Sequence, residues 1–459
     1  MTQTKNDFSQ GTVHGAILRM AGPITLAQLI NILYNIVDRM YIGHIPGAGS
    51  LALTGLGLCL PLISIVMAFA RLSGSGGGPL CSIERGKGNL DEAEHIMGNA
   101  FTLLMIFAVA LTVLGEVFLT PLLYAFGASP DTIGYGLSYA RIYLAGNVFV
   151  LISLGMNFFI NAQGFARTGM MTTLLGAVVN IILDPIFIFL LGWGVRGAAL
   201  ATVIAQGMSA LWVLRFLTGP KAILRLRLQY LRLRMRWVGR ILSLGFSGFV
   251  MALTNSVVQV VCNTVLQSFG GDLYVGVMTV INSVREVVSM PVLGINNAAE
   301  PVLGFNYGAG KPRRVRSGIV FISLVSVIYS LSVWALVRLI PGPLIRIFNA
   351  DPSLIAAGIP ALRLYFCAFF MMALQFSGQT AFVALGRSRQ AIFFSIFRKI
   401  ILVTPLTLLL PRAGLGVSGV FWAEAISNVV GGMACFGTML LTVYIPLGRP
   451  SREETREDV

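Results

Sequence analysis

Long apolar stretches constrain this chain more than any other feature of its sequence. Stretches of 20 or more apolar residues recur along all 459 residues, and about 20 such residues in a helix cross the hydrocarbon core of a bilayer. Only 11% of the residues are charged, whereas soluble domains carry about 25%. The sequence therefore predicts a polytopic membrane protein and excludes a water-soluble enzyme built from ordinary domains.

Glycine, proline and charged residues divide the apolar stretches into twelve predicted transmembrane helices. We expect these helices near 16–43, 51–80, 97–123, 133–160, 168–191, 196–218, 240–267, 273–304, 316–340, 354–384, 391–411 and 416–445. The predicted fold class is an all-α polytopic membrane protein. Few residues remain for a separate soluble domain.

Lysine and arginine concentrate in alternate connections between the predicted helices. Cations occur at 85–87, 167, 221–236, 311–316 and 387–389, whereas the intervening connections are nearly free of them. The positive-inside rule therefore places these connections and both termini in the cytoplasm of a cell. The acidic tail from Glu453 to Asp458 contributes little to this rule. The same loops account for the net charge of +15, so no nucleic-acid partner is expected.

The chain contains an internal repeat with a constant offset of 222 residues. The matching pairs are Pro79/Pro301, Gly86/Gly308, Gly88/Gly310, Phe126/Phe348, Pro130/Pro352, Arg141/Arg363, Tyr143/Tyr365, Gly164/Gly386, Arg167/Arg389, Gly194/Gly416 and Gly197/Gly419. The repeat predicts two six-helix bundles related by an axis along the membrane normal. We expect an N-terminal lobe at 1–218, a basic cytoplasmic linker at 219–239, and a C-terminal lobe with a short tail at 240–459.

The sequence also contains short patterns that elsewhere mark nucleotide-binding, metal or catalytic sites, but their context here does not support such sites. Gly192, Gly194 and Gly197 match a dinucleotide-binding pattern, but no strand precedes them and the pattern recurs in the second repeat. We interpret it as a tight connection between two helices. The linker could lie on an anionic membrane surface or bind a regulator, but a plain connection is the favoured interpretation. The five cysteines and three histidines form no disulfide, zinc or hydrolase pattern, and no segment matches an ATP-binding loop.

Six acidic residues lie inside predicted membrane helices, where ionisable groups are costly and usually functional. They are Asp38, Glu116, Asp184, Glu286, Glu300 and Glu424. For Glu116, Glu286 and Glu300 a structural ion pair or an exposed helix end is the favoured interpretation. The sequence leaves the role of Glu424 open.

Asp38 and Asp184 each have a polar residue one helical turn earlier, Tyr34 and Asn180. Pro185 lacks an N–H group and so frees a backbone carbonyl near residue 181. These are hard oxygen donors of the kind that a Na⁺ site uses, and a carboxylate in a low dielectric also takes up a proton more readily. The corresponding places in the second half hold Val260 and the segment 399–405, neither with an acid. We therefore expect ion coupling in the N-terminal half, the alternative being two buried structural acids.

Four motifs give the sequence a resemblance to the multidrug and toxic compound extrusion (MATE) family over nearly its whole length. They are Asp38-Arg-Met-Tyr-Ile-Gly43, Asn180-Ile-Ile-Leu-Asp184-Pro-Ile-Phe187, Gly197-Ala-Ala-Leu-Ala-Thr202 and Pro301-Val-Leu-Gly-Phe-Asn-Tyr-Gly-Ala-Gly310. The last resembles bacterial drug-efflux members in particular. The resemblance implies two bundles in a V around a central cavity. It also implies a secondary multidrug antiporter that exports amphipathic, often cationic, drugs or dyes by alternating access.

The resemblance also implies site residues. The family's cation site maps onto Asp38, Asn180, Asp184 and Thr202, as a site for H⁺, Na⁺ or both and a candidate Na⁺ site. Tyr34 and Asn157 map to the substrate cavity, and we also place Asn31 and Tyr139 there. No cofactor besides the coupling ion is expected. We expect a monomer in the plasma membrane, with the lipid bilayer as its surroundings. Glu300 stands where the drug-efflux subgroup is expected to have Gln.

One alternative transport function remains open on the sequence. A flippase for a lipid-linked precursor would need a cationic cavity for a pyrophosphate headgroup, for which Arg285, Arg398 and Lys399 are the candidates. A membrane-embedded enzyme is disfavoured because His14, His44 and His95 all lie near predicted helix ends or in loops. The exported compounds, the coupling ion and its stoichiometry are not determined by the sequence.

Overall fold

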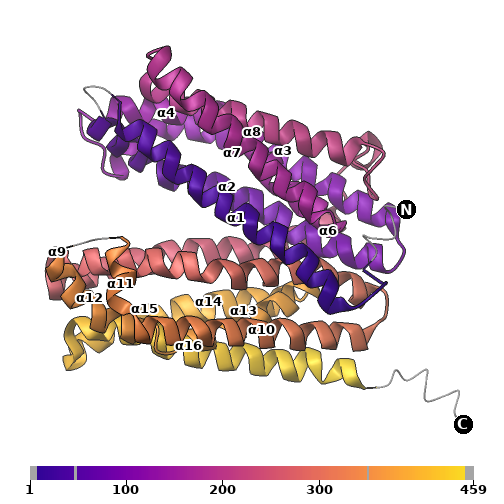
Figure 1. Cartoon of the computed structure of the whole chain (residues 1–459). Helices are drawn as coiled ribbons and strands as arrows, with labels where there is room; N and C mark the ends of the chain where they lie inside the picture. Colours follow the sequence, from indigo (N-terminus) through magenta and orange to yellow (C-terminus); the bar gives the residue numbers. More distant parts are fainter. Residues whose placement is uncertain (1–7, 46–48, 349–350, 450–459) are drawn as a thin grey trace, which may run out of the picture. The chain divides into compact units, whose positions relative to one another are not determined.

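The computed structural model describes residues 8–45, 49–348 and 351–449. Every regular element in these residues is a helix (Figure 1), which confirms the predicted all-α fold class. The acidic tail from Glu453 to Asp458 lies outside the described residues.

The helices of the first half correspond closely to the predicted segments. They are α1 (Val13–Gly43), α2 (Gly49–Gly86), α3 (Leu90–Ala125), α4 (Ile133–Ala145), α5 (Asn147–Gly155), α6 (Asn157–Ala162), α7 (Ala166–Pro185), the π-helix η2 (Ile186–Leu190), α8 (Gly194–Thr218) and the short 3-10 helix η3 (Leu228–Tyr230). The last of these lies in the predicted linker.

The second half contains more changes of helix type than the first. Its elements are α9 (Met235–Gly308), α10 (Pro312–Leu339), α11 (Pro341–Arg346), α12 (Pro352–Tyr365), α13 (Phe369–Ala384), α14 (Ser388–Ile396), η4 (Phe397–Val403), α15 (Thr404–Leu410), η5 (Pro411–Leu415), α16 (Gly416–Met439), η6 (Leu440–Tyr444) and η7 (Pro446–Gly448). Here η4, η5 and η6 are π-helices and η7 is a 3-10 helix.

The number of membrane spans depends on how bent and merged helices are divided. Within the described residues, eight helices are long and apolar enough to span a membrane, and ten if each of two bent pairs is one span. Two of the eight, Met235–Gly308 and Ser388–Gly448, hold 74 and 61 residues, well beyond the ~20 that one span needs. Gly271 (φ 65°) interrupts the first and Gly414 (φ 100°) the second. Divided at these glycines, the segments match the twelve predicted ones.

The described chain forms two compact units. The first, called unit 1 below, contains Gly22–Phe246; the second, unit 2, contains Phe8–Ala21 together with the residues from Ser247 onward. The beginning of α1 is tied to unit 2 by Arg314, whose Nη1 donates a hydrogen bond to the carbonyl oxygen of Gly11 at 2.8 Å. Helix α1 therefore passes from one unit to the other at Gly22, next to Pro23.

Each unit has an apolar core of its own, and apolar side chains also cover parts of its outside. On α3, Val109, Val113 and Val117 are 65%, 56% and 67% exposed. Their spacing of four residues places them on one face of the helix. An exposed apolar stripe of this kind suits contact with lipid, consistent with a multi-pass membrane protein.

The 222-residue repeat is visible in the backbone. Glycines with positive φ occur in pairs at this offset: Gly88/Gly310, Gly164/Gly386, Gly192/Gly414 and Gly194/Gly416. A Cβ atom on Gly197 would lie 2.7 Å from the backbone of Phe187, and one on Gly419 would lie 2.6 Å from the nitrogen of Pro411. Only glycine fits such approaches. The interpretation of both glycine patterns as tight helix connections is therefore confirmed.

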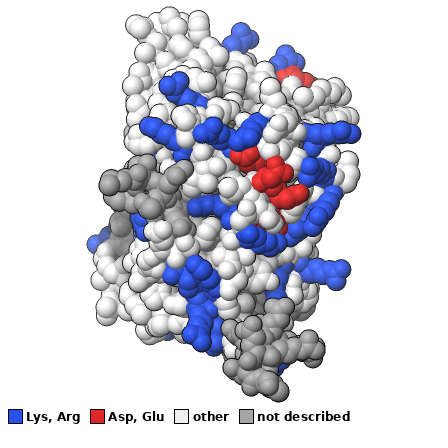
Figure 2. All heavy atoms as spheres, turned by 90° about the vertical axis from the view of Figure 1, so that its right-hand side faces the viewer, with Lys and Arg blue, Asp and Glu red and all other residues white. Residues whose placement is uncertain are grey.

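The linker is attached to the first two turns of α3. Glu92 accepts hydrogen bonds from Arg234 Nη1 at 3.2 Å and from Trp237 Nε1 at 2.6 Å. Tyr230 donates to Asp91, and this hydrogen bond raises the pKa of Tyr230 because it favours the neutral phenol. In Figure 2, Lys and Arg side chains surround a small group of Asp and Glu on the face that points to the right in Figure 1. The linker is thus a docked segment of unit 1.

Candidate cation site

Asp38 and Asp184 come together inside unit 1. Asp38, near the end of α1, is 8% exposed, and Asp184, near the end of α7, is fully buried. The two carboxyl groups lie within side-chain hydrogen-bonding range of each other. Two carboxylates can make such a contact only when a proton or another cation lies between them, because each carboxylate oxygen is an acceptor.

Asn180 and Thr202 complete the group that the sequence predicted. Asn180 Nδ2 donates to Asp184 Oδ1 at 3.2 Å and lies 3.5 Å from Thr202 Oγ1. Thr202 donates its own proton to the carbonyl oxygen of Ala198 at 3.0 Å. Because the Thr202 hydroxyl oxygen accepts only the long hydrogen bond from Asn180, it keeps one lone pair for a cation. Helices α1, α7 and α8 each contribute to this group, called the carboxylate site below.

Three buried oxygens of the carboxylate site lack a hydrogen-bond partner within the described part of the chain. They are Asp38 Oδ1, Asp184 Oδ2 and Asn180 Oδ1. Buried polar atoms are nearly always paired, so unpaired acceptors that converge in one place indicate a missing donor or cation. Carboxylate, amide and hydroxyl oxygens are ligands for hard cations. The residues present therefore fit either a proton or a small monovalent cation.

Two tyrosines lie beside the carboxylate site. Tyr139, on α4, is 3% exposed and lies near Asp38 and Thr202. Tyr34 lies one turn before Asp38 on α1 and is close to both carboxyl groups. Tyr143 stacks on Tyr139 with ring centroids 6.2 Å apart. Sequence reasoning did not assign Tyr143 to the site, although its spacing of four from Tyr139 on one helix indicates a shared face.

Asn31 and Asn157 make their hydrogen bonds elsewhere. Asn35 Nδ2 donates to the Asn31 carbonyl oxygen at 2.6 Å, and Asn157 Nδ2 donates to the carbonyl oxygen of Gly169 at 3.2 Å. In the described residues, no hydrogen bond connects Asn31 or Asn157 to Asp38 or Asp184. Their place in a substrate cavity stays a prediction.

Pro185 ends the α-helical part of α7. The π-helix η2 begins at the next residue, Ile186. A change from α to π changes the carbonyl that each N–H group reaches. The hydrogen-bond ladder thus changes next to Asp184, and the freed carbonyl near residue 181 stays a prediction.

Four intramembrane acids remain. Glu116 lies 3.9 Å from Arg141, and their side chains are 38% and 64% exposed. Glu286 is exposed and Glu300 is half-buried, and no ion pair of either is found in the described residues. Glu424 is 4% exposed and forms ion pairs with Arg398 and Lys399, each at 3.3 Å. The described residues contain no group of three or more His, Cys, Asp or Glu side chains that could hold a metal ion.

The long apolar helices, the two helical units with their repeated connections, and the buried group of Asp38, Asn180, Asp184 and Thr202 fit a multi-pass membrane transporter. The sequence profile of the MatE family matches residues 23–186 and 248–409. This chain therefore belongs to the MATE family of transporters and is not an enzyme. The predicted family resemblance is confirmed.

Known relatives and solved structures agree with this assignment. The chain is 23% identical to "Multidrug export protein MepA" of Staphylococcus haemolyticus (strain JCSC1435) over 92% of both chains. It is 24% identical to a "FAD transporter" of Shewanella oneidensis (strain MR-1), covering 93% of this chain and 95% of that one. It also matches a crystal structure of MATE in the bent conformation with a TM-score of 0.90 and 23% identity, over 97% of this chain and 98% of that chain.

Proposed function

We propose that the protein is a secondary active exporter that moves amphipathic organic compounds out of the cell in exchange for H⁺ or Na⁺. The observation that carries this proposal is the buried contact between Asp38 and Asp184, with unpaired oxygens on both. A purely structural role would be expected to leave these acceptors paired. The multidrug export named for the MepA relatives supports compounds of this class.

Occupancy of the carboxylate site supplies the switch in this mechanism. With a proton or Na⁺ bound, Asp38 and Asp184 attract a shared cation and α1 stays next to α7. When the cation leaves, two negative charges a few ångströms apart repel each other in a medium of low dielectric. The separation of α1 from α7 then couples loss of the cation to a change of conformation.

Helix α1 is suited to carry this change because it joins the two units. Its path crosses from unit 2 to unit 1 at Gly22, and Pro23 lies within the helix. Proline removes one helical hydrogen bond, so bending at this point costs less than elsewhere. We propose that α1 bends near Gly22 and Pro23 when the carboxylate site changes its occupancy.

The energy of the ion gradient is sufficient to drive export of a compound against its concentration gradient. One charge that crosses the membrane contributes about 2.3 kcal/mol per 100 mV, or about 3.5 kcal/mol at ~150 mV. At about 1.4 kcal/mol per decade, this energy sustains a compound gradient of roughly several hundredfold. We propose that the transporter works as a monomer in the plasma membrane with both termini in the cytoplasm. Inward cation flow then drives outward export.

Dye efflux from vesicles with an imposed ion gradient tests the proposal. We expect Asp38→Asn to slow gradient-driven efflux at least about tenfold, because the amide cannot exchange a proton and binds Na⁺ more weakly. Glu116→Gln is the matched control: it removes an intramembrane carboxylate that is exposed, and it should leave efflux unchanged. Unchanged efflux in Asp38→Asn, or transport that needs ATP and no gradient, would contradict the proposal. Replacing Na⁺ with choline identifies the coupling ion.

A further inference from the structure

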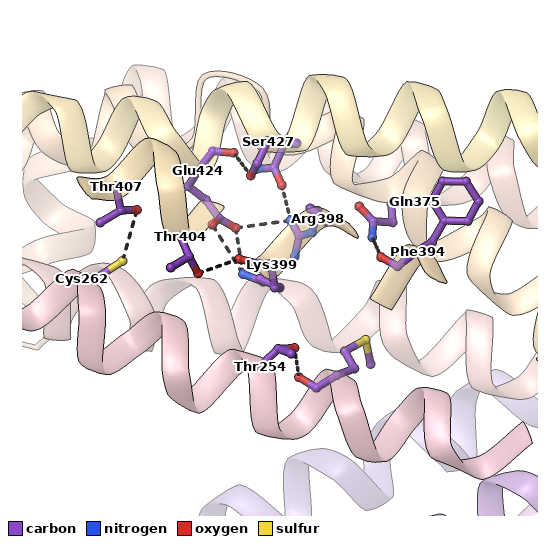
Figure 3. Close-up of polar contacts among 12 residues, drawn as sticks. Thr254, Cys262, Gln375, Phe394, Arg398, Lys399, Thr404, Thr407, Glu424 and Ser427 are labelled. Carbon is purple, nitrogen blue, oxygen red and sulfur yellow. Dashed lines mark hydrogen bonds and ion pairs between the residues drawn. The ribbon is translucent and has the colours of Figure 1, made fainter. Parts of the chain in front are cut away.

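Two adjacent cations are buried in unit 2. Arg398 and Lys399 lie on η4 and are 8% and 4% exposed. Figure 3 shows both side chains directed toward Glu424 of α16. A buried charge is stable only when partners compensate it. The partners of these two cations therefore decide what the group can do.

Glu424 is the buried acid that faces these cations. Lys399 Nζ donates to its two carboxylate oxygens at 3.3 and 3.4 Å, and Arg398 Nη1 donates to Oε1 at 3.3 Å. A third cation, Arg285 of α9, also interacts with Glu424 and lies beside the hydroxyl group of Tyr365. Its neighbour Glu286 is exposed to the surroundings. Three cations and one buried carboxylate leave an excess of two positive charges in this group, called the cationic cluster below.

The cationic cluster also contains N–H groups of Arg398 that donate no hydrogen bond within the described residues. Arg398 donates from Nη1 to Glu424 and to Asn428, and these are its hydrogen bonds within the described residues. A guanidinium carries five N–H groups, so those on Nε and Nη2 remain for another acceptor. Gly431 leaves room for this side chain, because a Cβ atom there would lie 2.9 Å from Arg398 Cγ.

In the sequence repeat, the cationic cluster and the carboxylate site share one equivalent position. At the 222-residue offset, Glu424 takes the position of Thr202. Thr202 thus belongs to the carboxylate site of unit 1, whereas Glu424, at the equivalent position, belongs to the cationic cluster of unit 2. If the two groups only stabilised their bundles, an excess of negative charge in one and of positive charge in the other would have no purpose.

We propose that Arg285, Arg398 and Lys399 form a binding site for a phosphate group of an organic compound. A phosphate dianion matches the two excess positive charges, and the planar guanidinium and the point charge of lysine are the usual partners of phosphate. The compound is either a soluble phosphate ester or a lipid with a phosphate headgroup. That such a compound is exported rests on the proposed function, but its binding does not.

Equilibrium binding to the purified full chain tests the site without any ion gradient. The probe is 4-methylumbelliferyl phosphate, and its neutral counterpart is 7-methoxy-4-methylcoumarin. We expect the phosphate ester to bind at least about tenfold more tightly than the neutral compound, and Arg398→Gln to remove this preference. Arg412→Gln is the matched control, since Arg412 is an exposed cation of the same unit. Equal losses in both variants would show non-specific attraction and overturn the proposal.

Glu424→Gln separates a binding site from a structural ion pair. This variant keeps all three cations and removes the carboxylate that competes with the ligand, so phosphate binding should become roughly tenfold tighter. If the ion pairs are only structural, the variant gains no affinity and the proposal is wrong. Because the cations stay in place, this result is readable even if Arg398→Gln fails to fold.

Nanodiscs distinguish the two sources of the phosphate group. If phosphatidic acid, but not phosphatidylcholine, displaces the fluorescent ester, the ligand is a lipid; if neither displaces it, the ligand is soluble. Failure of the ester and of phosphatidic acid to bind overturns the site. Failure of gradient-driven dye efflux alone would instead contradict the proposed function, so the two proposals fail separately.

Discussion

A proton and a sodium ion make different demands on the residues around Asp38 and Asp184. A proton needs one carboxylate oxygen and an acceptor beside it. Na⁺, like other hard cations, needs several oxygen ligands at once. Thr202 matters only if the ion is Na⁺. Its hydroxyl oxygen lies 3.5 Å from the Asn180 amide, where it can be one of several Na⁺ ligands, but a hydroxyl group does not take up a proton at ordinary pH.

Thr202→Val therefore discriminates between the two coupling ions. Valine keeps the shape of threonine and removes the oxygen. If Na⁺ binds, we expect its affinity, measured by the Na⁺ concentration at half-maximal efflux, to fall about tenfold or more because one ligand is lost. If only H⁺ binds, the pH dependence of efflux should change little. Thr218→Val is the control, since Thr218 makes the same type of bond to its own helix at the far end of α8.

The grouping of Asp38, Asn180, Asp184 and Thr202 could be predicted from the sequence because ionisable groups are rare in a membrane, and their role as a cation site stays a prediction. An acid in an apolar helix is conspicuous, and the spacing of four between Asn180 and Asp184 places them on one face. The partners of Glu424 were not predictable, because α16 and η4 are brought together by tertiary packing. The hydrogen bonds that Asn31 and Asn157 make depend in the same way on local geometry that no spacing reveals.

At the scale of elements, the linker is held more firmly than a plain connection requires. Asn99 Oδ1 accepts from the Arg234 amide at 2.7 Å, and Thr102 donates to the carbonyl oxygen of Leu231 at 2.7 Å. Gly98, the residue before Asn99, allows the linker backbone to approach α3. A Cβ atom there would lie 2.3 Å from the Tyr230 carbonyl oxygen.

Gly98→Ala should release the linker from α3 without unfolding unit 1. The added methyl group cannot fit beside the Tyr230 carbonyl, so the hydrogen bonds around it break. We expect trypsin to cut after the linker arginines roughly tenfold faster, at about 1 kcal/mol for each lost hydrogen bond. Mass spectrometry of timed digests measures the rate. Gly57→Ala is the control, because a Cβ atom at Gly57 meets nothing within 4 Å; equally fast cleavage in both variants would contradict the docking.

Helical spans were predictable because apolar runs and charged breaks leave a clear pattern. Bends and changes of helix type within a span could not be predicted in this way. The bend of 57° between α4 and the helices from Asn147 to Ala162 and the π-helix η4 do not interrupt the apolar pattern. A π-turn changes the hydrogen-bond register by one residue and leaves the hydropathy unchanged. The pattern therefore predicts where a span lies better than how it is bent.

At the scale of the whole molecule, the two halves share the backbone pattern of the repeat but differ in their buried charged groups. The bond from Asn157 to the Gly169 carbonyl recurs as a bond of 2.7 Å from Gln379 Nε2 to the Ala391 carbonyl, at the same 222-residue offset. Equivalent hydrogen bonds from a side chain to a backbone carbonyl thus occur in two halves whose buried charged groups differ. Such a transporter works in one direction only if its orientation in the membrane is fixed, and the positive-inside rule makes that orientation testable.

Labelling of introduced cysteines measures the orientation directly. Leu228 in the linker is 87% exposed, and Trp193 in the connection between α7 and α8 is 49% exposed. We expect Trp193→Cys to react with a membrane-impermeant maleimide in intact cells, and Leu228→Cys to react only after the membrane is made permeable. The wild-type chain is the control, because four of its five cysteines are buried and Cys367 is half-buried. If Leu228→Cys were labelled in intact cells, the basic linker would face outward and inward cation flow could not drive export as proposed.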